Sequence, residues 1–189
     1  MCGRYFTNID IYAGMPGILD ISADITDITG DIRPSDIAPV LSLRNGKSIL
    51  NKMKWGYPAP GNKGLLINAR IETIEEKPMF RQDFKYRRCV IPAAGFYEWD
   101  RNRQKATFTL PERQIIYLAG IYRNCEDMEH FTIITTQANA SMSPIHDRMP
   151  FIIDEEQLTE WMGDGFRSIM SSPMPELDVS IENEQLSFI

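Results

Sequence analysis

The second residue of the chain, Cys2, follows the initiator Met1 and is the first candidate for chemistry. Methionine aminopeptidases remove Met1 when the next side chain is small. This would leave a free α-amine (pKa about 8) and a thiol (pKa about 8.5) on one residue. Such an aminothiol condenses with an aldehyde to an imine, which the thiolate then closes to a thiazolidine. Alternatively, the thiol is an acyl-transfer nucleophile with its own amine as base. An ordinary, frayed second residue is the competing interpretation.

A second group of polar side chains lies between Asn68 and Glu72. In an extended strand Asn68, Arg70 and Glu72 project to one side, where an amide, a guanidinium and a carboxylate converge. Arg70 can hold a phosphate in bidentate fashion, and Asn68 can orient a nearby amine or carbonyl. A surface strand edge that carries an Arg–Glu pair is the structural alternative.

Two further residues are candidates for proton transfer. Glu98 lies between aromatic residues, and a carboxyl group buried there would hold its proton tightly, as a general acid or base requires. His146 precedes a predicted strand and can shuttle protons near neutral pH, with Asp147 to orient it or Arg148 to disfavour its charged form. The alternatives are an exposed glutamate on an amphipathic strand and a structural histidine in a turn.

Basic and aromatic residues alternate further along the chain. The basic members are Lys77, Arg81, Lys85, Arg87 and Arg88, and the aromatic ones are Phe80, Phe84 and Tyr86. This combination suits single-stranded nucleic acid, in which phosphates meet basic groups and bases stack on rings. Trp55, close to two lysines, allows the same interpretation. In each case an amphipathic element with a solvated face is the alternative.

The charge distribution favours a basic face on an acidic protein. The 189 residues carry a formal net charge of −6, which by itself argues against nucleic acid. Residues 51–103, however, contain 11 Lys and Arg against 6 Asp and Glu. Residues 104–189 contain 5 against 14. Such asymmetry indicates a local polyanion-binding face, unless the fold mixes these charges.

The sequence predicts that these residues are positioned by short strands with few helices. Strands are predicted at Gly3–Thr7, Ser48–Trp55, Cys89–Trp99, Ala106–Leu110, Ile115–Tyr122, Phe131–Thr136, Met149–Ile153 and Leu177–Glu182. Helices are predicted at Lys77–Arg88, Asp154–Met162 (with Asp154 as its cap) and Ala138–Met142. This order does not form βαβ units, so we expect one α+β domain over residues 1–189. Its sheet should be mostly antiparallel and barrel-like.

Composition excludes several classes of protein. The hydrophobic share of 43% and the charged share of 24% are those of a globular domain, not of a disordered or fibrous chain. No apolar run reaches the roughly 20 residues of a membrane span, and no secretory signal is visible. The three cysteines and two histidines fit neither a disulfide framework nor a metal site. We therefore expect no metal, no membrane partner and a cytoplasmic protein.

The candidate residues occur together in an ordered set of motifs. The set is Met1-Cys2-Gly3-Arg4, Trp55-Gly56, Asn68-Ala69-Arg70-Ile71-Glu72-Thr73, Lys77-Pro78-Met79-Phe80, Arg88-Cys89-Val90-Ile91-Pro92-Ala93, Gly95-Phe96-Tyr97-Glu98-Trp99, and Thr135-Thr136 through His146-Asp147-Arg148-Met149-Pro150. It covers roughly residues 1–160. In this respect the chain resembles the SRAP (SOS response-associated peptidase) family of abasic-site processing proteins.

The resemblance implies a fold and a function. The fold would be α+β, with a mostly antiparallel curved sheet that forms a pseudo-barrel and a few peripheral helices. The protein would bind single-stranded DNA that contains an abasic site, as a monomer in the bacterial cytoplasm and on the nucleoid when bound. Cys2 would form a thiazolidine crosslink with the ring-opened sugar and so shield the lesion. No cofactor is implied.

The resemblance also implies a role for each candidate residue. Asn68 would position the N-terminal residue or the opened sugar. Glu98 and His146 would transfer protons, and Glu98 would also assist reversal of the crosslink. The implied DNA contacts are Arg4, Arg70 and Arg81 through phosphates and Trp55 through stacking.

Two departures from the family pattern and three competing functions stay open at this point. The loop Gly56–Ile67 is shorter than is usual in the family, and the tail after Trp161 carries no family motif. The main alternative function is a thiol peptidase or amidohydrolase with Cys2 as acyl nucleophile, Asn68 at the oxyanion, and His146 or Glu98 as base. The others are a non-covalent reader of modified DNA and a purely structural β domain.

Overall fold

The computed structural model describes residues 2–13, 15, 25, 28–126 and 128–182. Its strands are β1 (Tyr5–Thr7), β2 (Gly30–Ile32), β3 (Ile37–Arg44), β4 (Lys47–Trp55), β5 (Tyr57–Pro58), β6 (Leu65–Leu66), β7 (Asn68–Arg70), β8 (Arg88–Ala93), β9 (Gly95–Trp99), β10 (Lys105–Thr109), β11 (Ile116–Asn124), β12 (Glu129–Gln137), β13 (Arg148–Pro150), β14 (Ile152–Ile153) and β15 (Asp178–Ile181). Its α-helices are α1 (Ile9–Ala13), α2 (Pro78–Tyr86), α3 (Leu158–Met162) and α4 (Phe166–Ile169), and short 3-10 helices are η2 (Pro60–Asn62), η3 (Ile71–Thr73) and η4 (Glu155–Gln157).

The main sheet closes on itself. Its strand order is β13-β12-β4-β3-β8-β11-β14, and β12 also pairs with β11, so β12, β4, β3, β8 and β11 form a ring. The pairs in this ring are antiparallel except for β12 with β4, which run parallel. β7 lies outside the ring path and pairs in parallel with β12. The predicted α+β class with a mostly antiparallel, curved sheet is confirmed.

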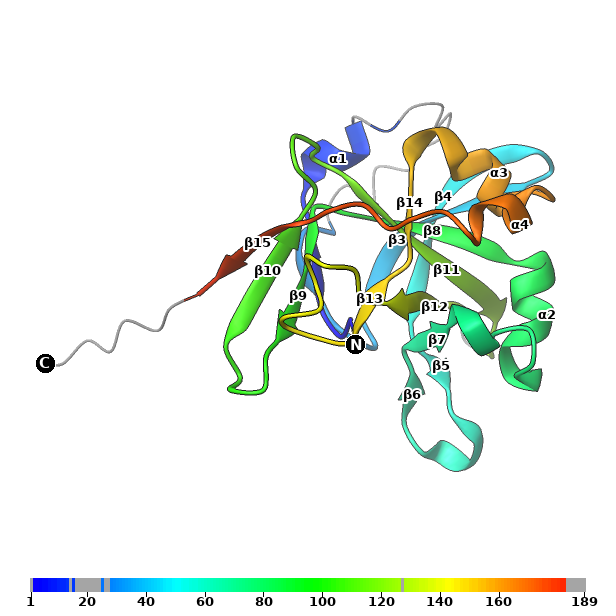
Figure 1. Cartoon of the computed structure of the whole chain (residues 1–189). Helices are drawn as coiled ribbons and strands as arrows, with labels where there is room; N and C mark the ends of the chain where they lie inside the picture. Colours follow the sequence, from blue (N-terminus) through cyan, green and yellow to red (C-terminus); the bar gives the residue numbers. More distant parts are fainter. Residues whose placement is uncertain (1, 14, 16–24, 26–27, 127, 183–189) are drawn as a thin grey trace, which may run out of the picture.

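A second sheet carries the N-terminal strand. Its order is β15-β10-β9-β1-β2, and every pairing in it is antiparallel. In Figure 1 the β9–β10 hairpin lies on one side of the molecule, and α2, α3 and α4 lie on the other. β9 follows β8 after the single residue Ala94, so the chain passes directly from the ring into this second sheet.

The two faces of the ring strands bury two separate cores. Neighbouring side chains of a strand point to opposite faces, and residues of β8 and β11 accordingly alternate between the two cores. Val90 and Ala119 join a core with residues of all four α-helices. Ile91 and Leu118 join a core with Tyr5 and residues of the second sheet. The second core is the one that reaches the N-terminus.

Arg88, the first residue of β8, ties the helices to the ring. It is buried, and its guanidinium donates hydrogen bonds to the carbonyl oxygens of Phe84, Lys85, Trp161 and Gly163 at 2.6–2.8 Å. These carbonyls belong to the ends of α2 and α3, where backbone acceptors have no partner within the helix. Burial lowers the pKa of Arg88 to about 10.

Most predicted elements are present, with three corrections. The predicted strands 89–99 and 149–153 are each divided in two, and the predicted helix 154–162 begins with the 3-10 turn η4, where Asp154 makes no side-chain cap. Residues 138–142 do not form a helix. Instead, Asn139 Oδ1 accepts hydrogen bonds from Ser141 Oγ and Met142 N, which stabilises a turn. No helix in the described ranges is long and apolar enough to cross a membrane.

Candidate functional site

Cys2 is fully buried at the start of the N-terminal segment, in the core between the ring and the second sheet. Burial raises the pKa of its thiol, and the negative charge of Glu98 raises it further. The backbone N–H of Arg4 has the opposite effect because it stabilises the thiolate. The thiol is therefore held in its protonated form at neutral pH.

The pairing of β1 with β9 explains why Glu98 is near Cys2. Tyr5 is opposite Phe96, and the N–H of Tyr97 donates to the carbonyl of Arg4 at 2.9 Å. In an antiparallel pair, each step towards the N-terminus of one strand is a step towards the C-terminus of the other. The segment before Tyr5 therefore continues alongside Tyr97 and Glu98. Glu98 is only 5% exposed. Of the two alternatives that the sequence left open, a buried and an exposed glutamate, the structure shows the buried one.

Asn68 contacts Cys2 directly. Its Nδ2 donates a hydrogen bond of 2.9 Å to the Cys2 carbonyl oxygen. Its Oδ1 is buried and accepts no hydrogen bond from any residue that the structure describes. The pairing of Asn68 with Ile133 on β12 fixes the position of the side chain. The site thus contains an unused acceptor beside the N-terminal residue.

Arg70 leaves the same strand, two residues later, on the exposed side. It lines two hollows. One is shared with Asn68 and, from η3 and α2, Thr73, Lys77 and Phe80. The other is shared mainly with β12, β13 and the loop between them. Lys77 is therefore a neighbour of Arg70 on this surface. The sequence showed it as a member of a basic run and of one motif, without predicting this proximity.

The strand expected over residues 68–72 is shorter than predicted, and Glu72 lies outside it. The strand ends at Arg70, and η3 turns Glu72 towards Arg148, whose Nη1 and Nη2 donate to the two carboxylate oxygens at 2.8 and 2.9 Å. Hydrogen bonds from Arg148 lower the pKa of Glu72. Arg148 also donates to the Thr135 carbonyl, so this pair fastens η3 to β12 and β13.

His146 lies in the loop between β12 and β13, and its side chain is 27% exposed. Its Nδ1 is 3.0 Å from the N–H of Arg148 and 2.9 Å from Asp147 Oδ1. The neutral ring accepts from that N–H, and the protonated ring donates to Asp147. Asp147 is thus placed to orient the ring, whereas the Arg148 guanidinium is held by Glu72. His146 and Asp147 line a hollow of about 570 Å³ with Trp99 and the turn 100–102.

The three remaining predicted DNA contacts have different environments. Arg4 forms an ion pair with Asp31 of β2 and lies over the ring of Tyr97, 5.6 Å from its centroid. Arg81 is exposed on α2. Trp55 is 0% exposed, which contradicts its predicted role as a stacking platform.

Trp55 is a core residue for clear reasons. Its ring packs against Tyr5 and Phe131, with centroids at 5.3 and 6.1 Å, and its Nε1 donates to the Ile67 carbonyl at 3.0 Å. Gly56 follows with φ +106, and a Cβ there would be 2.9 Å from Leu65. The short segment after Trp55 therefore folds back closely over the end of β4.

The described contacts join Cys2, Asn68 and Glu98 into one site, with Arg70 at its edge. His146 lines a separate hollow next to Trp99, the last residue of β9. In the described part of the chain, no group of three or more His, Cys, Asp and Glu side chains is placed to hold a metal ion. Among the described residues, Cys2, Cys89 and Cys125 form no disulfide bond.

Comparison with known proteins gives one family match and several relatives. Residues 1–187 match the family described as SOS response associated peptidase (SRAP). The chain is 36% identical to the abasic site processing protein YoaM of Bacillus subtilis over 184 residues, which cover 86% of this chain and 79% of that protein. It is 32% identical to the abasic site processing protein YedK of Escherichia coli over 179 residues, covering 86% and 79%.

A solved structure from Bacteroides thetaiotaomicron has the same fold. It superposes with a TM-score of 0.81 over 97% of this chain and 93% of the other, at 22% identity. A second, from Bordetella bronchiseptica, also superposes with a TM-score of 0.81, at 18% identity, over 96% and 100%. At such identities the likeness shows the fold alone.

Proposed function

The chain belongs to the SOS response associated peptidase (SRAP) family, and we propose on this basis that it captures abasic sites in single-stranded DNA through Cys2. The observation that carries the proposal is the environment of Cys2, which lies between the Asn68 amide and the Glu98 carboxylate. The relatives from B. subtilis and E. coli that bear the name abasic site processing protein support the substrate.

The proposed reaction begins after Met1 has been removed. The neutral α-amine of Cys2 attacks the aldehyde carbon of the ring-opened deoxyribose, and the resulting carbinolamine loses one water to give an imine. The Cys2 sulfur then bonds to the imine carbon, its proton leaves, and the nitrogen gains one proton. The product is a thiazolidine ring, and the whole sequence releases one molecule of water and needs no oxidant or cofactor.

The neighbouring groups fit these steps. The Oδ1 of Asn68, buried and without a described partner, is placed to accept a hydrogen bond from the freed amine and to hold it. Glu98 can give a proton to the departing hydroxide and later take one from the thiol. One carboxyl group would thus act first as general acid and then as general base. His146 is the proposed second proton carrier, through the hollow beside Trp99. Arg70 would hold the phosphate next to the lesion.

The raised pKa of Cys2 bears on the alternative function. A thiol peptidase needs a thiolate, which is the nucleophilic form of cysteine. Burial and the charge of Glu98 both oppose thiolate formation here. In the crosslinking reaction the amine attacks first, so a protonated thiol is no obstacle. The thiol environment therefore favours the crosslinking function over the peptidase.

The test uses a fluorescent single strand with one abasic site and a denaturing gel, after intact mass has shown that Met1 is absent. The wild-type protein should give a heat-stable band of slow mobility, and Cys2→Ala should give none. Cys125→Ser is the matched control, because Cys125 is also a cysteine outside any described disulfide bond but lies at the β11–β12 turn, away from Asn68. A protein that begins with Cys2 and forms no band would refute the proposal.

A further inference from the structure

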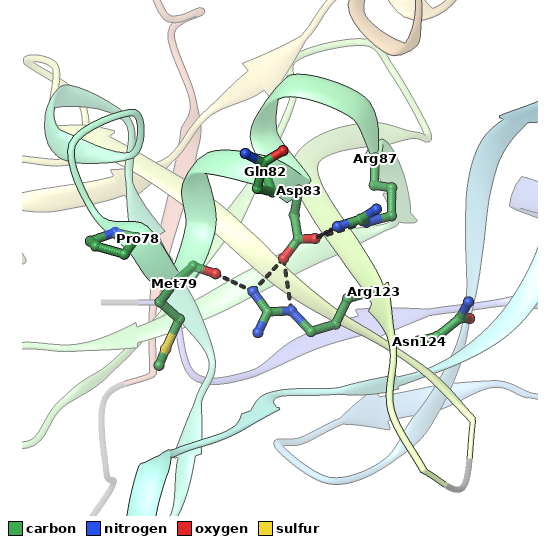
Figure 2. A pocket seen from close by; sticks show the side chains of 7 residues that line it. All are labelled: Pro78, Met79, Gln82, Asp83, Arg87, Arg123 and Asn124. Atoms are coloured by element: carbon green, nitrogen blue, oxygen red, sulfur yellow. Dashed lines mark hydrogen bonds and ion pairs between the residues drawn. The ribbon is translucent and has the colours of Figure 1, made fainter.

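A hollow between α2 and the end of β11 is not used by the proposed reaction. Its volume is about 460 Å³, within the range of small-ligand pockets. We call it the α2 notch, and its polar lining consists of Gln82, Asp83, Arg87, Arg123 and Asn124. Figure 2 shows Arg87 and Arg123 on either side of the carboxylate of Asp83.

The centre of the α2 notch is a carboxylate that holds two guanidinium groups. The side chain of Asp83 is 2% exposed. Arg87 donates to its Oδ1 and Arg123 to its Oδ2, each through Nε and Nη2. Arg123 also donates to the carbonyl of Met79 and lies over the ring of Tyr57, 4.1 Å from its centroid. Both guanidinium groups are therefore held in fixed positions.

The lining of the notch carries an excess of positive charge. Asp83 is the one carboxylate among the residues that line it, and Arg87 and Arg123 are two cations, so the net charge is +1. One arginine is enough to compensate a buried carboxylate. The second cation is thus not needed to balance Asp83. Arg87 is 40% exposed and presents its charge at the mouth of the notch.

The other polar groups of the notch suit the same kind of ligand. The side-chain amides of Gln82 and Asn124 can donate neutral hydrogen bonds from either side. Arginine, glutamine and asparagine side chains are among the groups that proteins use to contact phosphate oxygens of nucleic acids. A carboxylate ligand would use the arginines equally well, but the position of the notch favours phosphate.

The α2 notch adjoins the hollow of the proposed active site. Lys77 lines the hollow that contains Asn68 and Arg70, and the next two residues, Pro78 and Met79, line the notch. Arg81 is exposed on the same helix. A single strand that leaves the Arg70 hollow along the start of α2 would therefore pass Lys77 and Arg81 before it reaches the arginines of the notch.

We propose that the α2 notch is a second phosphate site, which binds a backbone phosphate of the captured strand several nucleotides from the lesion. This inference rests on the proposed function, because it takes the strand at Arg70 as its starting point. Asp83 does not contact the phosphate but fixes the two guanidinium groups that do. Each such contact releases counterions, which for a single strand contributes about 0.7 to the slope of log K against log salt.

The experiment measures non-covalent binding by fluorescence anisotropy in a Cys2→Ala background, with strands that carry a central abasic analogue without an aldehyde. A short strand of about four nucleotides fills the Arg70 hollow alone, and a long one of about sixteen also reaches the notch. Arg87→Gln should lower the long-to-short affinity ratio about fivefold at 0.1 M salt, since a slope of 0.7 corresponds to that factor. The salt slope for the long strand should fall by about 0.7.

Arg113→Gln is the matched control, because Arg113 is also an arginine that pairs with a carboxylate, that of Asp154, but lies outside the notch. It should leave the ratio and the slope unchanged. An unchanged ratio in Arg87→Gln, or an equal loss on both strands, would overturn the inference. Thymidine monophosphate is added as a competitor in the same assay. If it lowers the long-to-short affinity ratio in wild type but not in Arg87→Gln, the notch is assigned to free nucleotides instead.

A second variant separates the loss of paired hydrogen-bond donors from the loss of charge. Arg123→Lys keeps the charge but loses the paired donors, so it should lower the affinity ratio while the salt slope stays near that of wild type. A fall in slope equal to that of Arg87→Gln would contradict the assigned geometry. In parallel, the wild-type protein is mixed with a strand of the same short length that carries a true abasic site, and crosslinking is measured. Its absence would refute the proposed function, whereas its presence with an unaffected ratio would refute only the second phosphate site.

Discussion

Replacing Glu98 by glutamine separates the two effects that this carboxylate has on Cys2. The substitution keeps the volume of a side chain that is 5% exposed, and β9 is fixed by pairing with both β1 and β10, so the fold should be preserved. The negative charge of Glu98 raises the pKa of the Cys2 thiol, so its removal should lower that pKa. Burial, the larger cause, remains, and the thiol should still titrate above its ordinary value.

The same substitution should slow the crosslinking reaction. Glutamine cannot give or take a proton, and loss of a general acid–base group costs typically 10²–10⁴ in rate. This corresponds to about 3–5 kcal/mol of barrier. Glu98→Gln should therefore make the thiol more easily alkylated and yet form the crosslink at least about a hundredfold more slowly. The two rates should change in opposite directions.

Both rates can be measured on one preparation in a Cys125→Ser background, which removes the half-buried thiol. Alkylation of Cys2 is followed by peptide mass at alkaline pH, and crosslinking by single-turnover gel kinetics at neutral pH. Glu129→Gln is the control, because Glu129 is a partly buried carboxylate that pairs with Arg44 and acts on Cys89. If Glu98→Gln sped up both reactions, Glu98 would only suppress the thiolate, and its proposed proton transfer would be wrong.

Three further predictions follow from the described contacts. Asn68→Ala removes the hydrogen bond to the Cys2 carbonyl and should lower the single-turnover crosslinking rate about 2- to 13-fold, the equivalent of one neutral hydrogen bond. Arg88→Lys loses several charge-assisted bonds to helix-end carbonyls and should lower the free energy of unfolding by about 2–4 kcal/mol in urea titrations. Burial raises the pKa of Cys89, so the folded state binds more protons than the unfolded state above pH 9.0, the ordinary value of the thiol. Stability should therefore fall as pH rises. Cys89→Val should reduce the steepness of that fall by an amount that approaches about 1.4 kcal/mol per pH unit towards pH 10.5, as measured by denaturation between pH 9.0 and 10.5.

Residue type and local sequence made Cys2, Asn68 and Glu98 candidates, each with a structural alternative, but did not predict how they are arranged. What brings them together is the pairing of β1 with β9 and of β7 with β12. These pairings join segments far apart in the chain, and local propensity carries no information about such partners. The link between Glu72 and Arg148, 76 residues apart, was missed for the same reason.

The error at Trp55 has a different cause, because the signal was present. Along β4, Met53 and Trp55 are buried, while Lys52 is exposed and Lys54 is partly so. This is the period of two that a strand with one buried face must have. The alternation places the two lysines and the indole on opposite faces. Proximity in sequence suggested a joint role in binding DNA, but the strand geometry excludes it.

The order of the two bond-forming steps can be argued from the state of the Cys2 thiol. A thiolate would attack the aldehyde directly to give a reversible hemithioacetal, in competition with the amine. Burial and the charge of Glu98 keep the thiol protonated, so in the proposed reaction the amine can react first. The thiol then needs to lose its proton only when the imine is in place, and Glu98 is the adjacent acceptor. In the proposed reaction, the features that make Cys2 a poor general nucleophile thus favour a product that is closed by both its nitrogen and its sulfur.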